Sequence, residues 1–387
     1  MRVEHQLRAF DQILSQYDGT MPFHRFLPGY FKQHKQMGSS DRRWASRYCY
    51  SYFRMGKALS AHKREERLAI ADFLCHQTPS LVIENYLPSF VPAITLALPE
   101  KIALVEEAYP DFILAEVFSW SKALVSTINQ HAFDLSFFMQ PQLFIHVKAK
   151  DMSAVKAQLL AKDILAHEMD GNILALPNGT KLQEIVNDAN KYRVQDLSSQ
   201  KTAAYFLPQP ADYWWDCCAA SGGKSLLLHD LEPHIELLAS DVRENSLHNL
   251  TERFEQAGIR KYQKKVIDLL EDNKQILHHY TFDGILLDAP CTGSGTWGRT
   301  PEMLCHFDSN KIMHYVKLQK AFAAQVVKYL KPGKPLIYIT CSVFSAENDE
   351  VVEYMVKELG LKLEKMELIE GYKEQADSMF VARLVKP

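Results

Sequence analysis

The chain has 387 residues, of which 47% are apolar and 24% are charged, and its formal net charge is −3. This length predicts two or three domains, and this composition excludes a disordered or fibrous protein. The seven cysteines form no Cys-x-x-Cys pair, which argues against a disulfide framework or a bound metal. Because no segment resembles a signal peptide or a membrane span, we expect a cytoplasmic protein without membrane association, and a monomer by default.

Residues 1–135 are predicted to form a helical domain. Apolar residues recur there at helical spacing, as in Leu7, Phe10, Ile13 and Leu14, and again in Trp44, Tyr48, Tyr52 and Met55. Ser39-Ser40-Asp41 offers N-cap chemistry, and prolines such as Pro28 are expected to interrupt the helices. Residues 1–64 carry twelve lysines and arginines against four acids, a net charge of +8. This charge is typical of a surface that binds a polyanion, although a solvated helical surface explains it equally well.

Residues 136–190 are predicted to form a small α+β module. Strands are expected at 142–148, 164–169 and 172–176, and a helix at 152–160. Asp170-Gly171 supplies a turn between the last two strands.

Residues 191–387 alternate strands with helices, which is typical of an α/β fold with a doubly wound parallel sheet. Strands are expected near 214–218, 235–241, 264–268, 282–288 and 335–341, with a final pair at 361–368 and 379–385 forming an edge hairpin. Helices are expected to start near Gly223, Glu244, Lys311 and Ala346. Ligands of such sheets bind beyond the carboxyl ends of the strands, so the residues at those ends are the candidate site.

The first of these strands leads into a glycine loop. Two adjacent glycines let the backbone approach a ligand, and the following helix N-terminus favours polar or anionic groups. A nucleoside-triphosphate P-loop is excluded, because Cys218 stands where that motif needs a glycine. The loop is therefore predicted to bind a nucleoside, although a tight strand–helix turn is the alternative. Its candidate residues are Cys218, Ala219, Ala220, Ser221, Gly222, Gly223 and Lys224.

Two acids end the next two strands. Asp241, followed by Arg243, lies about twenty residues after the glycine loop, where an acid bonds ribose hydroxyls; a helix N-cap is the alternative. Asp268 could accept from an adenine amino group, or could be an ordinary turn acid. Together these positions predict an adenosine-containing cofactor such as S-adenosylmethionine.

The last two parallel strands each deliver a thiol. Asp288 ends one strand and is followed by Cys291, and Cys341 ends the other. A cysteine with a lowered pKa is a strong nucleophile, whereas a lone strand-end cysteine usually only packs. Two thiols at adjacent strand ends beside a carboxylate favour a catalytic role.

These motifs resemble those of the RsmB/NOL1/NSUN family of RNA cytosine-C5 methyltransferases. The resemblance rests on segments 216–225, 288–295 and 340–350, and the basic helical start resembles the NusB-like domain of RsmB. The family implies a Rossmann-like methyltransferase domain at 191–387, a small RRM-like module at 136–190 and a NusB-like RNA-binding domain at 1–135. This chain departs from the family pattern at Ser221, where a proline is usual.

The resemblance also implies a mechanism. Cys341 would attack C6 of the cytosine, Asp288 would bond the base near N3, and Lys224 would orient Asp288. Cys291 would assist product release, while Arg299 and Lys311 are candidates for gripping the RNA backbone. The implied cofactor is S-adenosylmethionine and the implied partner is RNA, most naturally ribosomal RNA, with transfer RNA as an alternative.

Two other functions stay open from the sequence. A methyltransferase for exocyclic amines typically has Asn/Asp-Pro-Pro-Tyr after the fourth strand, and this chain has Asp-Ala-Pro-Cys at 288–291. A non-catalytic RNA-binding or ribosome-assembly factor could keep the fold without turnover.

Overall fold

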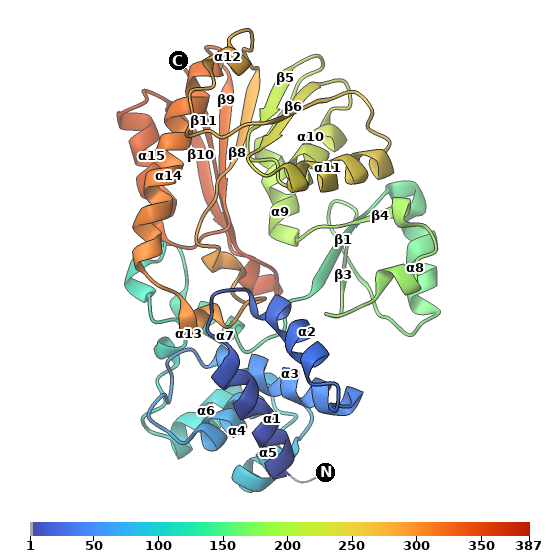
Figure 1. The fold of residues 1–387 in the computed structure, drawn as a ribbon, viewed down its shortest axis with the longest axis vertical. Coiled ribbons are helices and arrows are strands. Elements are labelled where there is room, and N and C mark those ends of the chain that lie inside the picture. The colour runs from blue at the N-terminus through green and yellow to red at the C-terminus, as the bar shows by residue number, and fades with distance from the viewer. Residues whose placement is uncertain (1–2) are drawn as a thin grey trace. The chain divides into compact units, whose positions relative to one another are not determined.

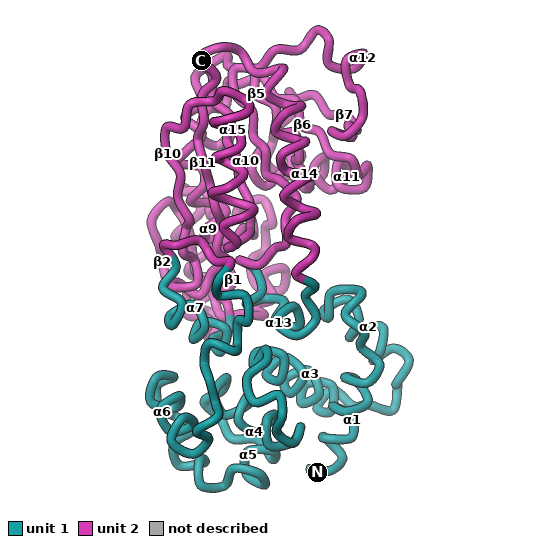
Figure 2. The backbone as a smooth tube through the Cα atoms, turned by 90° about the vertical axis from the view of Figure 1, so that its left-hand side faces the viewer, with its two compact units in different colours: residues 1–122, 128–140, 296–308 teal, residues 123–127, 141–295, 309–387 magenta. Residues whose placement is uncertain are grey.

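The computed structural model describes residues 3–387. Met1 and Arg2, which belong to the predicted helical domain and its basic surface, lie outside the described residues. The chain forms two compact units, coloured separately in Figure 2. Unit 1 comprises residues 1–122, 128–140 and 296–308, and unit 2 comprises 123–127, 141–295 and 309–387. The domain boundaries at 135 and 190 remain predictions.

Unit 1 is helical, as the sequence predicts. Its helices are α1 (Val3–Gln16), α2 (Phe23–Gln33), α3 (Ser39–Arg54), α4 (Arg64–Cys75), α5 (Leu81–Tyr86), α6 (Leu98–Ala108), α7 (Gln130–Ser136) and α13 (Met303–His306). The apolar stripes form its core: Phe10, Ile13 and Tyr48 are fully buried. This burial is what helical spacing of apolar residues predicts.

Two local expectations for unit 1 are wrong. Pro28 lies inside α2 rather than at its end. It is the sixth of eleven residues in this helix, and the backbone hydrogen bond that it removes is the one that its own N–H would have donated. The N-cap of α3 is Gly38, and α3 begins at Ser39. Asp41 contributes from within the first turn, where its carboxylate accepts from the Gly38 N–H at 3.1 Å.

Segment 296–308, which follows the Cys291 loop in sequence, is part of unit 1. Trp297 is buried and packs against Trp120 and Phe307, with ring centroids 5.4 and 4.8 Å away. The buried Glu302 carboxylate accepts from the Phe23 N–H at 2.9 Å.

Unit 2 contains the small α+β module. Its four strands run in the order β2-β3-β1-β4 and are β1 (Leu143–Val147), β2 (His167–Met169), β3 (Ile173–Leu176) and β4 (Tyr192–Val194). Helix α8 (Met152–Leu160) packs its buried Val155 and Leu159 into the same core as Ile145. The first half of the strand expected at 164–169 is not in the sheet, because the chain turns at Asp163 with φ of +56° and reaches β3 only from His167.

The larger sheet of unit 2 is doubly wound, with the order β10-β11-β9-β8-β5-β6-β7. Its strands are β5 (Tyr213–Asp216), β6 (Glu236–Asp241), β7 (Gln263–Val266), β8 (Gly284–Asp288), β9 (Pro335–Thr340), β10 (Lys362–Ile369) and β11 (Met379–Val385). β5 to β9 are parallel, and β10 and β11 form the expected antiparallel edge hairpin.

Helices cover both faces of this sheet (Figure 1). On one face lie α10 (Gly223–Leu231) and α11 (Glu244–Ala257), and on the other lie α14 (Asn310–Val326) and α15 (Asp349–Lys357). Short helices α9 (Leu197–Lys201) and α12 (Lys274–Leu277) complete the connections. The central strands β8 and β9 are almost entirely buried, as apolar runs between two helical layers must be.

Among residues 3–387, no helix is both long and apolar enough to cross a membrane.

Candidate functional site

The parallel strands bring four chain segments to one edge of the sheet. Asp216 of β5 pairs with Ala239 of β6 and Leu286 of β8, so these strands end at similar levels. The glycine loop follows β5, Asp241 ends β6, Asp288 ends β8, and Cys341 follows β9. This is the edge at which the sequence places the site.

The glycine loop is folded tightly against β6 and α11. Ala219 N–H donates to the Ser240 carbonyl at 2.9 Å, and Gly222 has φ of +81°. A Cβ on Gly222 would lie 2.8 Å from the Phe254 ring and 3.0 Å from Leu250. Glycine is therefore required here both by conformation and by space.

Ser221 contacts α11 through its side chain. Arg253 donates from Nη1 to the Ser221 hydroxyl at 2.8 Å and to the Ser221 carbonyl at 3.1 Å. The departure from the family's proline thus replaces a stiff ring with a hydrogen-bonded side chain, and the arginine restrains the loop instead.

Asp241 is buried and oriented by backbone donors. One carboxylate oxygen accepts from Ala220 N–H at 3.0 Å, and the other accepts from Arg243 N–H at 2.9 Å. The Arg243 guanidinium approaches the second oxygen at 3.3 Å. Asp268, which is partly exposed, accepts from Leu270 N–H at 2.9 Å and closes a turn after β7. Asp268 makes the turn contact of an ordinary turn acid, whereas Asp241 is not the N-cap of α11, which is Arg243, and bonds the glycine loop instead.

Lys224 and Asp288 form an ion pair of 3.0 Å. The lysine is buried, whereas the Asp288 side chain is 30% exposed and remains accessible to a ligand. Behind them lies Asp216, fully buried, which accepts from the Ser225 hydroxyl at 2.6 Å. Burial, reinforced by the Asp288 charge, raises the pKa of Asp216 to about 7.

The two strand-end thiols meet. The sulfurs of Cys291 and Cys341 are 3.3 Å apart. The hydrogen bond with Cys341, together with burial, raises the pKa of Cys291 well above its ordinary value. Either sulfur can be the donor of this contact, and the sulfur that accepts the hydrogen bond as a thiolate is the nucleophile of the pair.

Glu347 ties the two thiol loops together. It is fully buried and accepts from Thr292 through both its N–H at 2.9 Å and its hydroxyl at 2.5 Å. It also accepts from the Ser342 hydroxyl at 2.5 Å and from the Gln319 amide of α14 at 3.0 Å. One carboxylate thus fixes the residues next to Cys291 and Cys341.

The structure brings together most of the residues that the sequence singles out at the ends of the sheet strands. Arg299 belongs to unit 1, and the exposed Lys311 belongs to α14 of unit 2. Sequence reasoning assigned no role to Glu347 or Arg253. Glu347 lies in one of the motifs that carry the family resemblance, so a signal existed, whereas nothing local marks Arg253.

The site fits an adenosine-containing methyl donor on its own geometry. Gly222 and Gly223 contribute no side chain of their own at the start of α10, and Asp241 is held with both oxygens oriented. Carboxylate oxygens have further lone pairs for ribose hydroxyls. In residues 3–387 no group of three or more His, Cys, Asp or Glu side chains is placed to hold a metal ion.

Comparisons with known proteins agree with this geometry. Residues 203–385 match the family model described as 16S rRNA methyltransferase RsmB/F. Ribosomal RNA small subunit methyltransferase B of Salmonella arizonae is 31% identical over 204 residues, which cover 50% of this chain and 46% of that protein. Its counterpart in Xylella fastidiosa strain 9a5c is 32% identical over 207 residues, covering 54% and 47%. The chain therefore spans about half the length of the curated relatives that it matches.

Solved structures share the fold. The crystal structure of PH0851 has a TM-score of 0.67 at 20% identity, covering 92% of this chain and 93% of that chain. NSun6 from Pyrococcus horikoshii with SFG has a TM-score of 0.60 at 18% identity, covering 69% of this chain and 97% of that chain. A methyltransferase homologue from Pyrococcus horikoshii has a TM-score of 0.57 at 20% identity, covering 68% and 92%. These likenesses show a Rossmann-like methyltransferase fold.

Proposed function

We propose that this chain, whose residues 203–385 belong to the RsmB/F methyltransferase family, methylates C5 of a cytosine in RNA with S-adenosylmethionine. The observation that carries the proposal is the pair of thiols 3.3 Å apart, next along the sheet edge to the Lys224–Asp288 ion pair. Methylation of an exocyclic amine needs no such thiols. Ribosomal RNA is the proposed substrate, because the curated relatives are named for the small-subunit RNA.

The chemistry requires a nucleophile because C5 of cytosine is unreactive. The Cys341 sulfur adds to C6, and the electron pair of the C5–C6 double bond becomes available at C5. Lys224 and Asp288 hold a proton near N3, where negative charge develops as the sulfur adds. S-adenosylmethionine supplies the electrophilic methyl group, and the glycine loop and Asp241 would hold its adenosine part.

Release of the product needs two further bond changes. The C5 hydrogen leaves as a proton, its electron pair re-forms the C5–C6 double bond, and the C6–sulfur bond breaks to return Cys341 as a thiolate. We assign Cys291 to this step because it is in contact with Cys341. Cys291 must first lose its proton to solvent, and its thiolate, a strong base because its pKa is raised, then takes the C5 proton and becomes a thiol again.

The target cytosine must be unstacked before Cys341 can reach C6, because that face of the base is covered in a helix. Single-stranded or locally melted RNA is therefore the proposed form of the substrate, and Arg299 and Lys311 remain candidates for its phosphates.

The test measures labelled methyl transfer from S-adenosylmethionine to total RNA from a strain that lacks this gene, followed by nucleoside analysis. We expect label in 5-methylcytidine, no label with Cys341→Ala, and an accumulated RNA–protein adduct with Cys291→Ala. Cys75→Ala, which changes a thiol of unit 1, is the matched control and should retain activity.

Full activity of Cys341→Ala would overturn the assignment of the nucleophile. Transfer to no RNA, with RNA binding intact, would instead favour the non-catalytic binding factor.

A further inference from the structure

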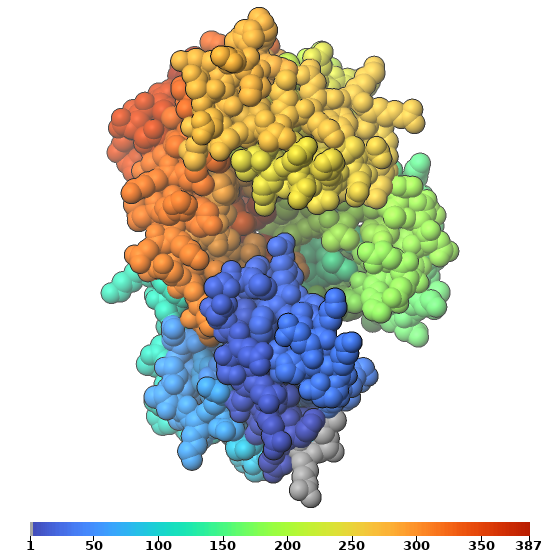
Figure 3. Space-filling model, in the orientation of Figure 1, coloured from blue at the N-terminus to red at the C-terminus, as the bar shows by residue number. Residues whose placement is uncertain are grey.

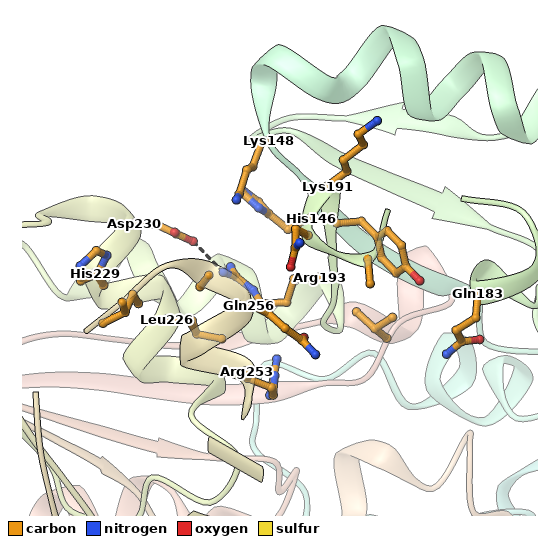
Figure 4. A pocket seen from close by; sticks show the side chains of 16 residues that line it. His146, Lys148, Gln183, Lys191, Arg193, Leu226, His229, Asp230, Arg253 and Gln256 are labelled. Carbon is orange, nitrogen blue, oxygen red and sulfur yellow. Dashed lines mark ion pairs between the residues drawn. The ribbon is translucent and has the colours of Figure 1, made fainter. Parts of the chain in front are cut away.

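Unit 2 also contains a pocket that the two thiols do not line. Its volume is about 390 Å³, and it is bounded by the α+β module on one side and by α10 and α11 on the other (Figure 4). In the space-filling view the module, in green, adjoins the surface near residue 250, in yellow (Figure 3). Four cationic side chains line it against one acid: Lys148, Lys191, Arg193 and Arg253 against Asp230.

Arg193 has an unused donor in this pocket. Its Nη1 pairs with Asp230 at 2.9 Å, and its Nε donates to Gln195 at 3.1 Å. Its Nη2 is buried and has no hydrogen-bond partner among the described residues. A buried guanidinium nitrogen without an acceptor is costly, and the charge of Arg193 is balanced on one side only, by Asp230.

Arg253 brings a second guanidinium to the same pocket. It is held in place by the Ser221 hydroxyl and carbonyl, and Figure 4 shows it approaching the space that Arg193 enters. Burial lowers the pKa of Arg253, and the nearby charge of Arg193 adds a smaller lowering. Two like charges held close together, one with an unsatisfied donor, form a site for an anion that contacts both.

The remaining lining indicates what kind of anion binds. Lys148 is exposed at the rim, Val194 is 50% exposed, and Tyr192 offers part of an aromatic ring. Cations next to apolar and aromatic surface are typical of sites for single-stranded nucleic acid, whereas a site for a free inorganic anion needs no apolar surface.

We propose that this pocket binds a backbone phosphate of single-stranded RNA, through Arg193 and Arg253, with Lys148 and Lys191 contacting the flanking phosphates. This proposal depends on the proposed function in one respect only, namely that the bound polymer is RNA. It adds an RNA contact apart from Asp288, Cys291 and Cys341, through Arg253, whose guanidinium also bonds Ser221 of the glycine loop.

The test compares two double variants of the full chain. Lys148→Gln/Lys191→Gln removes the flexible cations of the pocket, and Lys150→Gln/Lys162→Gln removes two exposed lysines of the same module outside it. Binding of a fluorescent 12-nucleotide RNA is measured by anisotropy at several salt concentrations.

For the pocket pair we expect Kd to rise about tenfold and the slope of log K against log salt to become shallower by about 0.7 per lysine. The control pair should change Kd less than about twofold. Arg193→Lys, which keeps the charge but loses the planar fork, should weaken RNA binding similarly and raise KM for RNA without lowering kcat.

Equal effects of the two double variants would overturn the proposal. The proposal would also be overturned if the pocket variants lost binding to 5′-AMP or inorganic phosphate but kept their affinity for RNA. The pocket would then be a site for a small anion. Because binding needs no turnover, failure of methyl transfer with intact pocket-dependent RNA binding would reject the proposed reaction and not this site.

Discussion

Replacing Glu347 by Gln removes the charge that joins the two thiol loops while keeping the size of the side chain. Each carboxylate oxygen accepts two hydrogen bonds, one oxygen from Thr292 N–H and Gln319 and the other from the hydroxyls of Thr292 and Ser342. The glutamine carbonyl can keep the first pair of donors. Its amide must then face the two hydroxyls, which have to reverse direction and accept instead.

The expected loss follows from this geometry. A hydrogen bond to a charged acceptor contributes about 1.5–3 kcal/mol and one to a neutral acceptor about 0.5–1.5 kcal/mol, so the two retained bonds together lose about 2 kcal/mol. Glu347→Ala also leaves the Thr292 N–H and one of the two Gln319 amide hydrogens buried without an acceptor, while the other still bonds the Pro290 carbonyl, and this raises the loss to about 4 kcal/mol. Because Thr292 follows Cys291 and Ser342 follows Cys341, Glu347→Gln should also lower kcat about tenfold or more.

Hydrogen exchange measured peptide by peptide is the suitable assay, because the two compact units need not unfold together. Peptides from β9 and α15 should show the loss, and peptides from unit 1 serve as the internal reference. Glu302→Gln is the matched control: that buried glutamate accepts from Phe23 N–H, its other oxygen has no partner among the described residues, and burial raises its pKa.

Glu302→Gln should therefore lower the free energy of local opening around this residue by less than about 0.5 kcal/mol, or should raise it. If both Glu347 variants matched wild type within about 0.5 kcal/mol in β9 and α15, the carboxylate could not be what holds the thiol loops.

Three further predictions concern the same sheet. The folded-state pKa of Asp216 is raised to about 7 from an ordinary 3.8, so the folded protein binds more protons than the unfolded one between these values and stability falls as pH rises from about 4 to 7. Asp216→Asn should remove up to roughly 4 kcal/mol of that fall, seen as a difference in unfolding free energy between variant and wild type that changes between about pH 4 and 7. Gly284→Ala would place a Cβ 2.5 Å from the buried Trp214 ring and should cost about 3 kcal/mol or more, measured by urea unfolding; a smaller loss would mean that the ring can move. Diamide should link Cys291 to Cys341 and abolish activity until dithiothreitol is added, with the link identified by peptide mapping; unchanged activity after complete oxidation would contradict the roles of both thiols.

The sequence predicts the sheet well because its signals are local. An apolar run that ends in a polar residue marks both a buried strand and its place at the sheet edge, as for Asp241, Asp288 and Cys341. Parallel strands then bring their ends together, so the meeting of the two thiols could be expected before their distance was known.

What the sequence does not predict depends on partners far along the chain. β4 has only three residues, and it is a strand because β1 offers it an edge for pairing. The contact from Arg253 to Ser221 joins positions 32 residues apart, and no periodicity marks it. Likewise, nothing in the apolar pattern of Trp297 and Phe307 shows that they pack into the helical unit.

The membership of segment 296–308 in unit 1 has a consequence for how such a protein can change over evolution. The helical unit is completed by a piece of chain inserted between two strands of the sheet, so it is not a removable N-terminal appendage. A gene that lost residues 1–140 would keep Trp297 and Phe307 without the aromatic partners that bury them. Transplanting either half to another protein therefore requires rewriting the segment that follows the Cys291 loop.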